Sequence, residues 1–476
     1  MHPSALAKRV PILVTAIIIA FYLYGLGKLP LLGPDEPRYV QVAREMFLSG
    51  DLLTPRLGGH TWFEKPALLY WMIVGAFKIF GVSEWAARLG PALCGLFTIA
   101  AVWCVGREVE KEHSRFGFWS VIVTASCLGL IVFSRAASFD VVITTTTTWS
   151  LACFLLHELP ATRRKRLLLA GFYAFVGLSL LAKGLVGIVI PFGVVGVYYL
   201  LRRSWPARSV WLSLFWGVPL ALAVSAIWYG PVIAKHGWTF IDEFFIQHHF
   251  ARYVSNKYHH PQPIYFYPVI ILMLVLPWPV HLISALARAR RWEWRGGDSL
   301  SIVCVFSLAW LLLPIVFFSF SGSKLPGYVL PALPGAALLV SYRLTFVRDA
   351  KWPLVMAGAT LVAVLVVLNF FAAPFARRES VRDLLSLADA HGYANAPVLA
   401  QRGDDRSAEF YAYGRVVYGA NGEPLTFDEI SVDEARARGA KFVVFIPVEY
   451  AENFRGVPAI EIIGNNGKTA VLGWKP

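Results

Sequence analysis

The sequence predicts a mainly α-helical bundle that crosses a membrane about eleven times, followed by a small C-terminal α/β domain outside the membrane. Of the 476 residues, 57% are hydrophobic and 16% are charged, whereas about 25% of the residues of a soluble domain are charged. The apolar residues form runs of about 20, the length that a helix needs to cross the hydrocarbon core. Lysines and arginines gather between these runs.

The apolar runs define the expected spans in chain order. The stretch from Lys8 to Gly27 has some features of a signal peptide, but its apolar run is long and lacks a clear cleavage site, so we expect it to be the first span. The spans are expected at residues 10–28, 86–106, 116–134, 141–158, 167–182, 185–201, 210–235, 265–287, 299–320, 327–342 and 352–373.

The basic clusters predict the orientation. With a cytoplasmic N-terminus, every inside loop is basic, as the positive-inside rule requires. The inside clusters are Lys8-Arg9, Arg107 to Arg115, Arg163 to Arg166, Arg202 to Arg208, Arg288 to Arg295 and Arg343 to Lys351. The outward segments are then residues 29–85, 135–140, 183–184, 236–264, 321–326 and those after 374.

Charge and cysteines exclude other classes. The net charge of +14 is spread over short clusters rather than one basic face, so we expect no nucleic-acid partner. The five cysteines lie in apolar stretches without CxxC spacing, which predicts buried thiols and neither disulfides nor a cysteine metal site.

The composition becomes polar after the last span. Strands are expected at residues 397–400, 441–447 and 460–463, and helical stretches at 379–391 and 432–439. We therefore expect a membrane domain at 1–373, with a catalytic outer loop at 29–85, and an outer α/β domain at 374–476.

The first outer loop holds the acidic pair Asp35-Glu36, directly before an amphipathic helix expected at 38–49. Ordinary helix capping explains such a pair equally well. Farther along the same loop, Glu64-Lys65 lies between aromatic residues at the start of an apolar helix, where charges are costly unless they are paired. A lysine that reaches back to the membrane surface is the alternative explanation for Lys65.

Other outer segments also carry charges at the ends of spans. Asp140 borders an apolar run, and a local ion pair with Arg135 is the simple explanation. Lys183 interrupts about 35 apolar residues and marks a turn that suits a phosphate contact. Lys324 lies on a further turn, before a span whose start is broken by prolines. The segment 236–264 is expected to be a loop rich in histidine and aromatic residues.

In their order along the chain, these segments resemble the polyprenyl-phosphate-dependent membrane glycosyltransferases of the GT-C fold. The likeness is strongest to the bacterial lipid A aminoarabinose transferases and extends to their protein mannosyltransferase relatives. Its pieces are Gly33 to Tyr39, Gly50-Asp51, Phe63 to Pro66 with Tyr70-Trp71, Ser134 to Asp140, Ala182 to Gly184, His249 with Arg252-Tyr253, Pro277-Trp278, and Ser323 to Pro326 with Tyr328. The chain looks shorter than these transferases, and Pro37 stands where they tend to have Thr.

The resemblance implies a role for each matching residue. Asp35 would be the catalytic carboxylate, with Glu36 beside it and Asp140 as a second acid. The carrier phosphate and sugar would contact Arg38, Tyr39, Lys65, Tyr70, Lys183, Arg252, Lys324 and Tyr328. Glu64 and His249 would correspond to metal ligands. A zinc site with only two protein ligands would be weak.

The resemblance also implies partners and a location. We expect an undecaprenyl-phosphate sugar as donor, with aminoarabinose or a hexose as the sugar, and lipid A, another glycan or a protein as acceptor. The expected location is the bacterial inner membrane, with the C-terminal domain in the periplasm. The alternatives are a transporter or flippase of a lipid-linked sugar, another kind of membrane transferase, and a non-catalytic scaffold. A transporter should show charges near mid-span and repeats, whereas here the charges lie at span ends.

Overall fold

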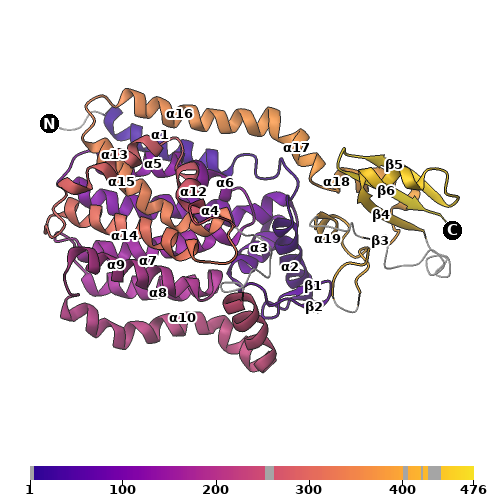
Figure 1. Cartoon of the computed structure of the whole chain (residues 1–476), viewed down its shortest axis with the longest axis horizontal. Helices are drawn as coiled ribbons and strands as arrows, with labels where there is room; N and C mark the ends of the chain where they lie inside the picture. Colours follow the sequence, from indigo (N-terminus) through magenta and orange to yellow (C-terminus); the bar gives the residue numbers. More distant parts are fainter. Residues whose placement is uncertain (1–4, 252–261, 400–405, 420–421, 427–440, 476) are drawn as a thin grey trace. The chain divides into compact units, whose positions relative to one another are not determined.

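The computed structural model describes residues 5–251, 262–399, 406–419, 422–426 and 441–475, and only the backbone of residues 5–11 and 248–251. These residues are mainly helical, and they divide into two compact units (Figure 1). The bundle unit comprises Met1–Tyr24, Phe63–Leu69 and Gly90–Ala363. The sheet unit comprises Gly25–Trp62, Tyr70–Leu89 and Val364–Pro476.

Each expected apolar run forms a helix or a broken pair of helices. The helices are α1 (Ala5–Leu23), α4 (Glu84–Glu110), α5 (Phe116–Ser126), α6 (Leu128–Phe133), α7 (Phe139–Glu158), α8 (Lys165–Lys183), α9 (Val186–Arg202), α10 (Arg208–Ile241), α12 (Phe266–Leu274), α13 (Pro279–Ala287), α14 (Ser299–Ser319), α15 (Leu333–Thr345) and α16 (Lys351–Val366). In the bundle unit, α8 packs against α7, α9 and α10, and α14 packs against α9 and α15 (Figure 1).

Six helices of the described chain are long and apolar enough to cross a membrane, or seven if the bent pair α12 and α13 counts as one span. Length and composition alone decide this number. Some expected spans are not among these helices. For example, α5 and α9 are shorter than the 18 residues required. The structure therefore supports a mainly helical protein with several apolar helices.

Two expected spans, 116–134 and 265–287, are broken rather than continuous. Cys127 leaves the helical region with ψ of 121° and separates α5 from α6, and α12 and α13 meet at 118°. The two breaks complete each other: Leu128 N–H donates to the Leu276 carbonyl at 2.9 Å, and Trp278 Nε1–H donates to Ser126 Oγ at 3.0 Å. Irregular backbone is tolerated inside a membrane protein when its polar groups are paired in this way.

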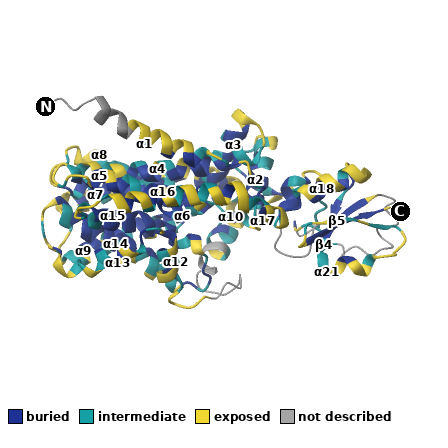
Figure 2. Ribbon diagram, turned by 90° about the horizontal axis from the view of Figure 1, so that it is seen from above, coloured by how far each residue is buried: buried dark blue, intermediate teal, exposed yellow. Residues whose placement is uncertain are grey.

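Burial separates interior helices from peripheral ones. The most apolar window of α7 is 83% buried, whereas that of the helix from Lys351 to Arg378 is 11% buried (Figure 2). Both windows are apolar, and exposing an apolar surface to water costs more free energy than exposing it to lipid. We therefore expect lipid to cover α16.

The loop expected at 236–264 is wrong in its first part. α10 continues to Ile241 and is followed by a π-helix, η1 (Asp242–Ala251), while residues 252–261 lie outside the described part. Gly237, with φ of 58°, redirects the chain without ending the helical hydrogen bonding. Phe240 and Phe244 then pack against Trp228, with ring centroids 5.4 and 6.1 Å from that of Trp228, so these two aromatic residues are core rather than loop surface.

The sheet unit contains two short strands, β1 (Arg56–Leu57) and β2 (His60–Thr61), and a four-stranded sheet near the C-terminus. The larger sheet has the order β3-β4-β6-β5, with β3 (Val398–Leu399) parallel to β4 (Phe442–Pro447). The strands β5 (Ile460–Asn465) and β6 (Thr469–Trp474) are antiparallel neighbours. The expected strands are therefore present, and β6 is an addition that the sequence reasoning missed.

Helices accompany this sheet. They are α17 (Ala372–Arg378), α18 (Arg382–Ala388), the π-helix η5 (Asp389–Tyr393), α19 (Ser407–Tyr411) and α21 (Val448–Ala451), and α2 (Asp35–Ser49) and α3 (Leu68–Phe80) lie earlier in the chain. α18 packs on β5 and β6. The expected helix at 379–391 is thus present with breaks, and the one at 432–439 lies outside the described residues.

Candidate active site

The acidic pair of the first outer loop lies in the first turn of α2. The helix begins at Asp35, three residues before the expected start, and Pro37 occupies a first-turn position where a missing N–H costs no hydrogen bond. It ends at Gly50, whose φ of 71° is the left-handed conformation that glycine adopts without strain. Tyr39, Val42, Ala43 and Met46 are buried, as expected for the apolar side of an amphipathic helix, but Gln41, expected on the polar side, is buried as well.

Glu36 is held in a buried, bidentate ion pair with Arg88. Arg88 Nε donates to Glu36 Oε1 and Arg88 Nη2 donates to Oε2, both at 2.7 Å. The remaining Arg88 N–H groups donate to the carbonyl oxygens of Leu26, Leu29 and Pro30 at 2.7–2.8 Å. All five guanidinium donors are therefore used, as a buried arginine requires.

This ion pair fixes the approach to α2. Glu36 Oε2 also accepts the Leu32 N–H at 2.9 Å, so residues 26–36 are fastened to one side chain of α4. The side chains of Glu36 and Arg88 are only 7% and 4% exposed. These contacts favour a positioning role for Glu36 over the catalytic role expected of it.

Asp35, the neighbouring carboxylate, has a different environment. Its side chain is 49% exposed and Oδ1 accepts a hydrogen bond from Arg38 Nη2, one helical turn onward. The Arg38 guanidinium in turn lies between the rings of Tyr39 and Trp62, 5.5 and 5.2 Å from their centroids. Asp35 is thus oriented by a well-packed cation and still accessible to a ligand.

The C-terminal segment holds the other end of α2. Arg44 Nη1 donates to the Phe410 carbonyl at 3.0 Å, and its guanidinium lies 4.1 Å from the Tyr413 ring centroid. On the same helix, Glu45 accepts the backbone N–H groups of Gly58 and Gly59 at 2.8 and 3.1 Å. The domain boundary expected at residue 373 stays a prediction, but residues after it share a compact unit with α2.

A second acidic centre lies in the bundle unit, at the start of α7. Ser138 caps this helix by accepting the Asp140 N–H at 3.1 Å, which sets Asp140 in the first turn. Lys183, the last residue of α8, donates to Asp140 Oδ1, and its Nζ lies 4.5 Å from the Tyr328 ring centroid. The local Asp140–Arg135 pair is therefore wrong: Arg135 donates instead to the Phe21 carbonyl at 2.7 Å.

The segment from Lys324 to Tyr328 closes around Asp140. A Cβ atom at Gly327 would overlap Asp140 Oδ2, so any larger residue there would have to displace the Asp140 carboxylate. A 3-10 helix, η3 (Pro326–Ala332), follows, as the prolines of this stretch predict. Lys324 is 9% exposed and its Nζ donates to the Gln262 carbonyl at 2.9 Å. Thus Asp140, Lys183 and Tyr328 are brought together, with Lys324 on the adjoining turn.

Glu64 and Lys65 form an ion pair with an Nζ to Oε1 distance of 2.9 Å, and their side chains are 7% and 13% exposed. Phe63, just before them, contacts His236 and Phe240 edge to face. Of the described side chains, no group of three His, Cys, Asp or Glu could hold a metal ion. Only the backbone of His249 is described, so a metal site formed by Glu64 and His249 stays a prediction.

The other expected site residues are placed as follows. Tyr39 and Tyr70 are buried, in α2 and α3. Only the backbone of His249 is described, in η1, and Arg252 lies outside the described residues. The sequence reasoning missed Arg88, although an arginine at the edge of an apolar run is a signal for a buried partner.

The chain is similar to known transferases in sequence. The profile of the dolichyl-phosphate-mannose-protein mannosyltransferase family matches residues 11–241. An undecaprenyl phosphate-alpha-4-amino-4-deoxy-L-arabinose arabinosyl transferase of Pseudomonas aeruginosa is 34% identical over 331 residues, which are 68% of this chain and 57% of that relative. Arabinosyl transferase 2 of Pseudomonas fluorescens, which has the same description, is 29% identical over 355 residues. These are 71% of this chain and 60% of that relative. The chain thus spans less than two thirds of the length of these relatives.

Solved structures share the fold. ArnT of Cupriavidus metallidurans bound to undecaprenyl phosphate superposes with a TM-score of 0.78 at 21% identity, over 98% of each chain. An oligosaccharyltransferase of Archaeoglobus fulgidus has a TM-score of 0.54 at 12% identity, over 92% of this chain and 69% of that one.

Proposed function

We propose a function from one premise: the chain is related in sequence to the undecaprenyl phosphate-aminoarabinose arabinosyl transferases and the mannosyltransferase family, and it has the fold of ArnT. The proposed activity is transfer of a sugar from a polyprenyl-phosphate donor to an acceptor at the outer face of a membrane. The donor is supported by the similarity to undecaprenyl phosphate-aminoarabinose arabinosyl transferases and to ArnT bound to undecaprenyl phosphate. Lipid A, another glycan or a protein would be the acceptor.

The observation that carries this proposal is the division of labour at the start of α2. Glu36 is fully engaged with Arg88, whereas Asp35 is half exposed and oriented by Arg38. A general base must be able to reach the proton that it removes, and it works best when its geometry is fixed beforehand. Asp35 meets both requirements.

The proposed step is a single displacement at the anomeric carbon. The acceptor oxygen forms a bond to that carbon as the bond from the carbon to the phosphate oxygen breaks, so the configuration inverts. The electron pair leaves with the polyprenyl phosphate, and the acceptor proton moves to Asp35. No cofactor is needed to balance the reaction.

Cations would stabilise the departing phosphate. The candidate cations are Lys65, Lys183 and Lys324 of the bundle unit. Each already donates a hydrogen bond from Nζ: Lys65 to Glu64, Lys183 to Asp140 and Lys324 to the Gln262 carbonyl. Charge-assisted hydrogen bonds from such groups become stronger as negative charge develops on the leaving oxygen. Asp140 would set the position of Lys183, and Arg252 would act as a further phosphate contact.

We also propose the orientation expected from the sequence. The helix ends with arginine clusters, such as the start of α8 and the end of α9, would face the cytoplasm. Asp140 and Lys183 lie at the opposite ends of α7 and α8 and would face outward, in a bacterial inner membrane crossed about eleven times. The sheet near the C-terminus would be a small periplasmic α/β domain.

The experiment is transfer by the purified full-length chain in detergent, with labelled undecaprenyl-phosphate sugars and an extract of outer-leaflet acceptors. Asp35→Asn is the test variant. Asp383→Asn is a matched control, because Asp383 also lies in the first turn of a helix, is 49% exposed and pairs with an arginine. We expect label to move with the native chain and the control variant only.

Two other outcomes would contradict the proposal. Transfer by the Asp35→Asn variant at the native rate would remove Asp35 from the mechanism. Binding of the labelled donor without any consumption would instead favour a transporter or flippase of a lipid-linked sugar.

A further inference from the structure

Two adjoining cavities lie at the end of α9 that is farthest from Lys183. One has a volume of about 620 Å³ and the other about 730 Å³, and they share Leu200 and Arg203 in their walls. The 17 residues of α9 separate this end from the turn after Lys183, which corresponds to about 25 Å of helix. The cavities are therefore remote from Asp140 and its partners.

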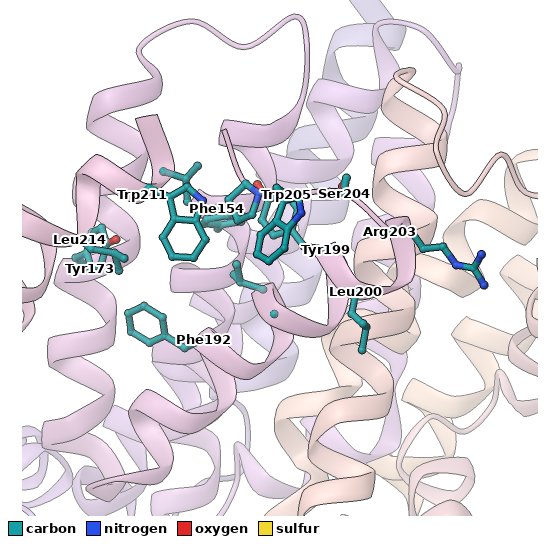
Figure 3. A pocket seen from close by; sticks show the side chains of 14 residues that line it. Phe154, Tyr173, Phe192, Tyr199, Leu200, Arg203, Ser204, Trp205, Trp211 and Leu214 are labelled. Atoms are coloured by element: carbon teal, nitrogen blue, oxygen red, sulfur yellow. The ribbon is translucent and has the colours of Figure 1, made fainter. Parts of the chain in front are cut away.

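The first cavity is an aromatic slot. Phe154, Tyr173, Phe192 and Tyr199 line it from α7, α8 and α9, and Trp205 and Trp211 line it from the turn after α9 and from α10 (Figure 3). Trp205 is 86% exposed, which is unusual for so large an apolar ring in contact with water. Tryptophan commonly takes this position at the boundary between lipid tails and headgroups.

The second cavity is lined by cations. Arg203, Trp294 and Arg295 form its wall together with Leu200 and Leu201. Figure 3 shows the Arg203 side chain directed away from the aromatic slot. Arg202 fastens this corner, since its Nη2 donates to the Gly296 carbonyl at 2.9 Å and so holds the segment with Arg295 near the end of α9.

We propose that the two cavities together bind one anionic phospholipid of the surrounding membrane. An acyl chain would occupy the aromatic slot, and the headgroup phosphate would lie between Arg203 and Arg295. The apolar slot suits a tail, whereas two arginines without an acid among the residues of either cavity wall suit a net negative headgroup. This site is independent of the proposed transfer reaction.

The first measurement is lipid binding to the purified full-length chain by native mass spectrometry. Phosphatidylglycerol is the anionic probe, and phosphatidylcholine, with no net charge, is the reference. Each basic residue near a net negative headgroup contributes about 1 kcal/mol, which is roughly fivefold in binding, so two of them predict a preference of about 25-fold for phosphatidylglycerol.

Variants separate the headgroup from the tail. Replacing Arg203 and Arg295 together by Ala should abolish the preference, while replacement by Lys should retain it. Arg163→Ala removes an exposed arginine elsewhere on the bundle and should change little. Gly196→Leu should fill the slot and weaken both lipids, because nothing lies within 4 Å of its Cβ position; Gly358→Leu on α16, equally open, is the matched control.

Three outcomes would overturn the proposal. The first is equal binding of the two lipids to the native chain. The second is an unchanged preference in the folded Arg203→Ala and Arg295→Ala double variant. The third is displacement of phosphatidylglycerol by undecaprenyl phosphate at equimolar amounts, with the same dependence on the two arginines, which would make the carrier lipid the occupant.

Discussion

The starts of α2 and α7 both place acidic side chains beside cations, but they differ in how many carboxylates serve structure and chemistry. At α2 two adjacent carboxylates have separate roles: Glu36 is 7% exposed and paired with Arg88, while Asp35 is 49% exposed beside Arg38. At α7 a single carboxylate, Asp140, is 19% exposed and bonded to Lys183. At α2, mutations should therefore change either stability or transfer rate, depending on which carboxylate is replaced. At α7, a mutation of Asp140 should change both.

The largest expected effect comes from Arg88→Met. Removing one partner of a buried ion pair leaves Glu36 charged and unpaired, which costs about 3–5 kcal/mol of stability. The apparent melting temperature of the purified chain should fall accordingly. The double variant Glu36→Leu with Arg88→Met should recover much of the loss, since no buried charge remains. Equal melting temperatures for the native and Arg88→Met chains would contradict the role of this pair.

Asp140→Asn should give the next largest effect, and on two properties at once. Lys183 would lose its ionic partner at a site where its side chain is only 15% exposed, which costs about 1–3 kcal/mol. Both the melting temperature and the transfer rate should fall. A change in one of them alone would show that the two roles are separable here as well.

Gly327→Ala should have a smaller effect that acts mainly through Asp140, the nearest neighbour of the added methyl group. The added methyl group would displace the Asp140 carboxylate from Lys183, so we expect transfer to slow by about tenfold, the effect of losing roughly 1.4 kcal/mol of a charge-assisted hydrogen bond. The control is Gly358→Ala, because its Cβ position has no neighbour within 4 Å. Native transfer rates for both variants would mean that Asp140 need not lie where it does.

The smallest expected effect concerns Glu409, on α19 beside α2. Burial raises the pKa of Glu409 above its ordinary value, although the adjacent Arg406 opposes this. The folded chain therefore holds this proton more tightly than the unfolded chain, so the contribution of Glu409 to stability falls as pH rises from the ordinary carboxyl pKa through the raised one.

The Glu409→Gln variant cannot titrate at this position. Its melting temperature, measured between about pH 4 and 7.5, should gain on that of the native chain as pH increases. Arg406 keeps its second partner, Glu423, at 2.6 Å, so the variant should still fold. Parallel melting curves across this range would contradict the assignment.

Local patterns in the sequence predicted much of this molecule. The amphipathic spacing after Asp35-Glu36 predicted α2, and the apolar runs predicted the helices, because both depend on residues close together in the chain. Asp35 and Lys183 stood out by their places next to a helix start and within a long apolar run, and the resemblance to a known family added Tyr328. Their proposed roles stay predictions.

Long-range pairings were beyond such reasoning. The contact between Glu36 and Arg88 joins residues 52 positions apart, and Asp140 selects Lys183, 43 positions away, over nearby Arg135. The breaks at Cys127 and Leu276 are likewise stable only because each supplies a hydrogen-bond partner to the other. None of these choices has a periodic signal, since each depends on where the folded chain brings a distant residue.

The most direct test of the central claim compares Asp35→Asn with Glu36→Gln in two assays, donor binding and single-turnover transfer, both expressed per folded molecule. We expect Asp35→Asn to bind the polyprenyl-phosphate donor as the native chain does but to transfer sugar about 10²–10⁴-fold more slowly, the usual contribution of a general base. Glu36→Gln should lose folded protein, while the molecules that remain folded transfer at close to the native rate. Rapid transfer by folded Asp35→Asn would show that Asp35 is not the general base.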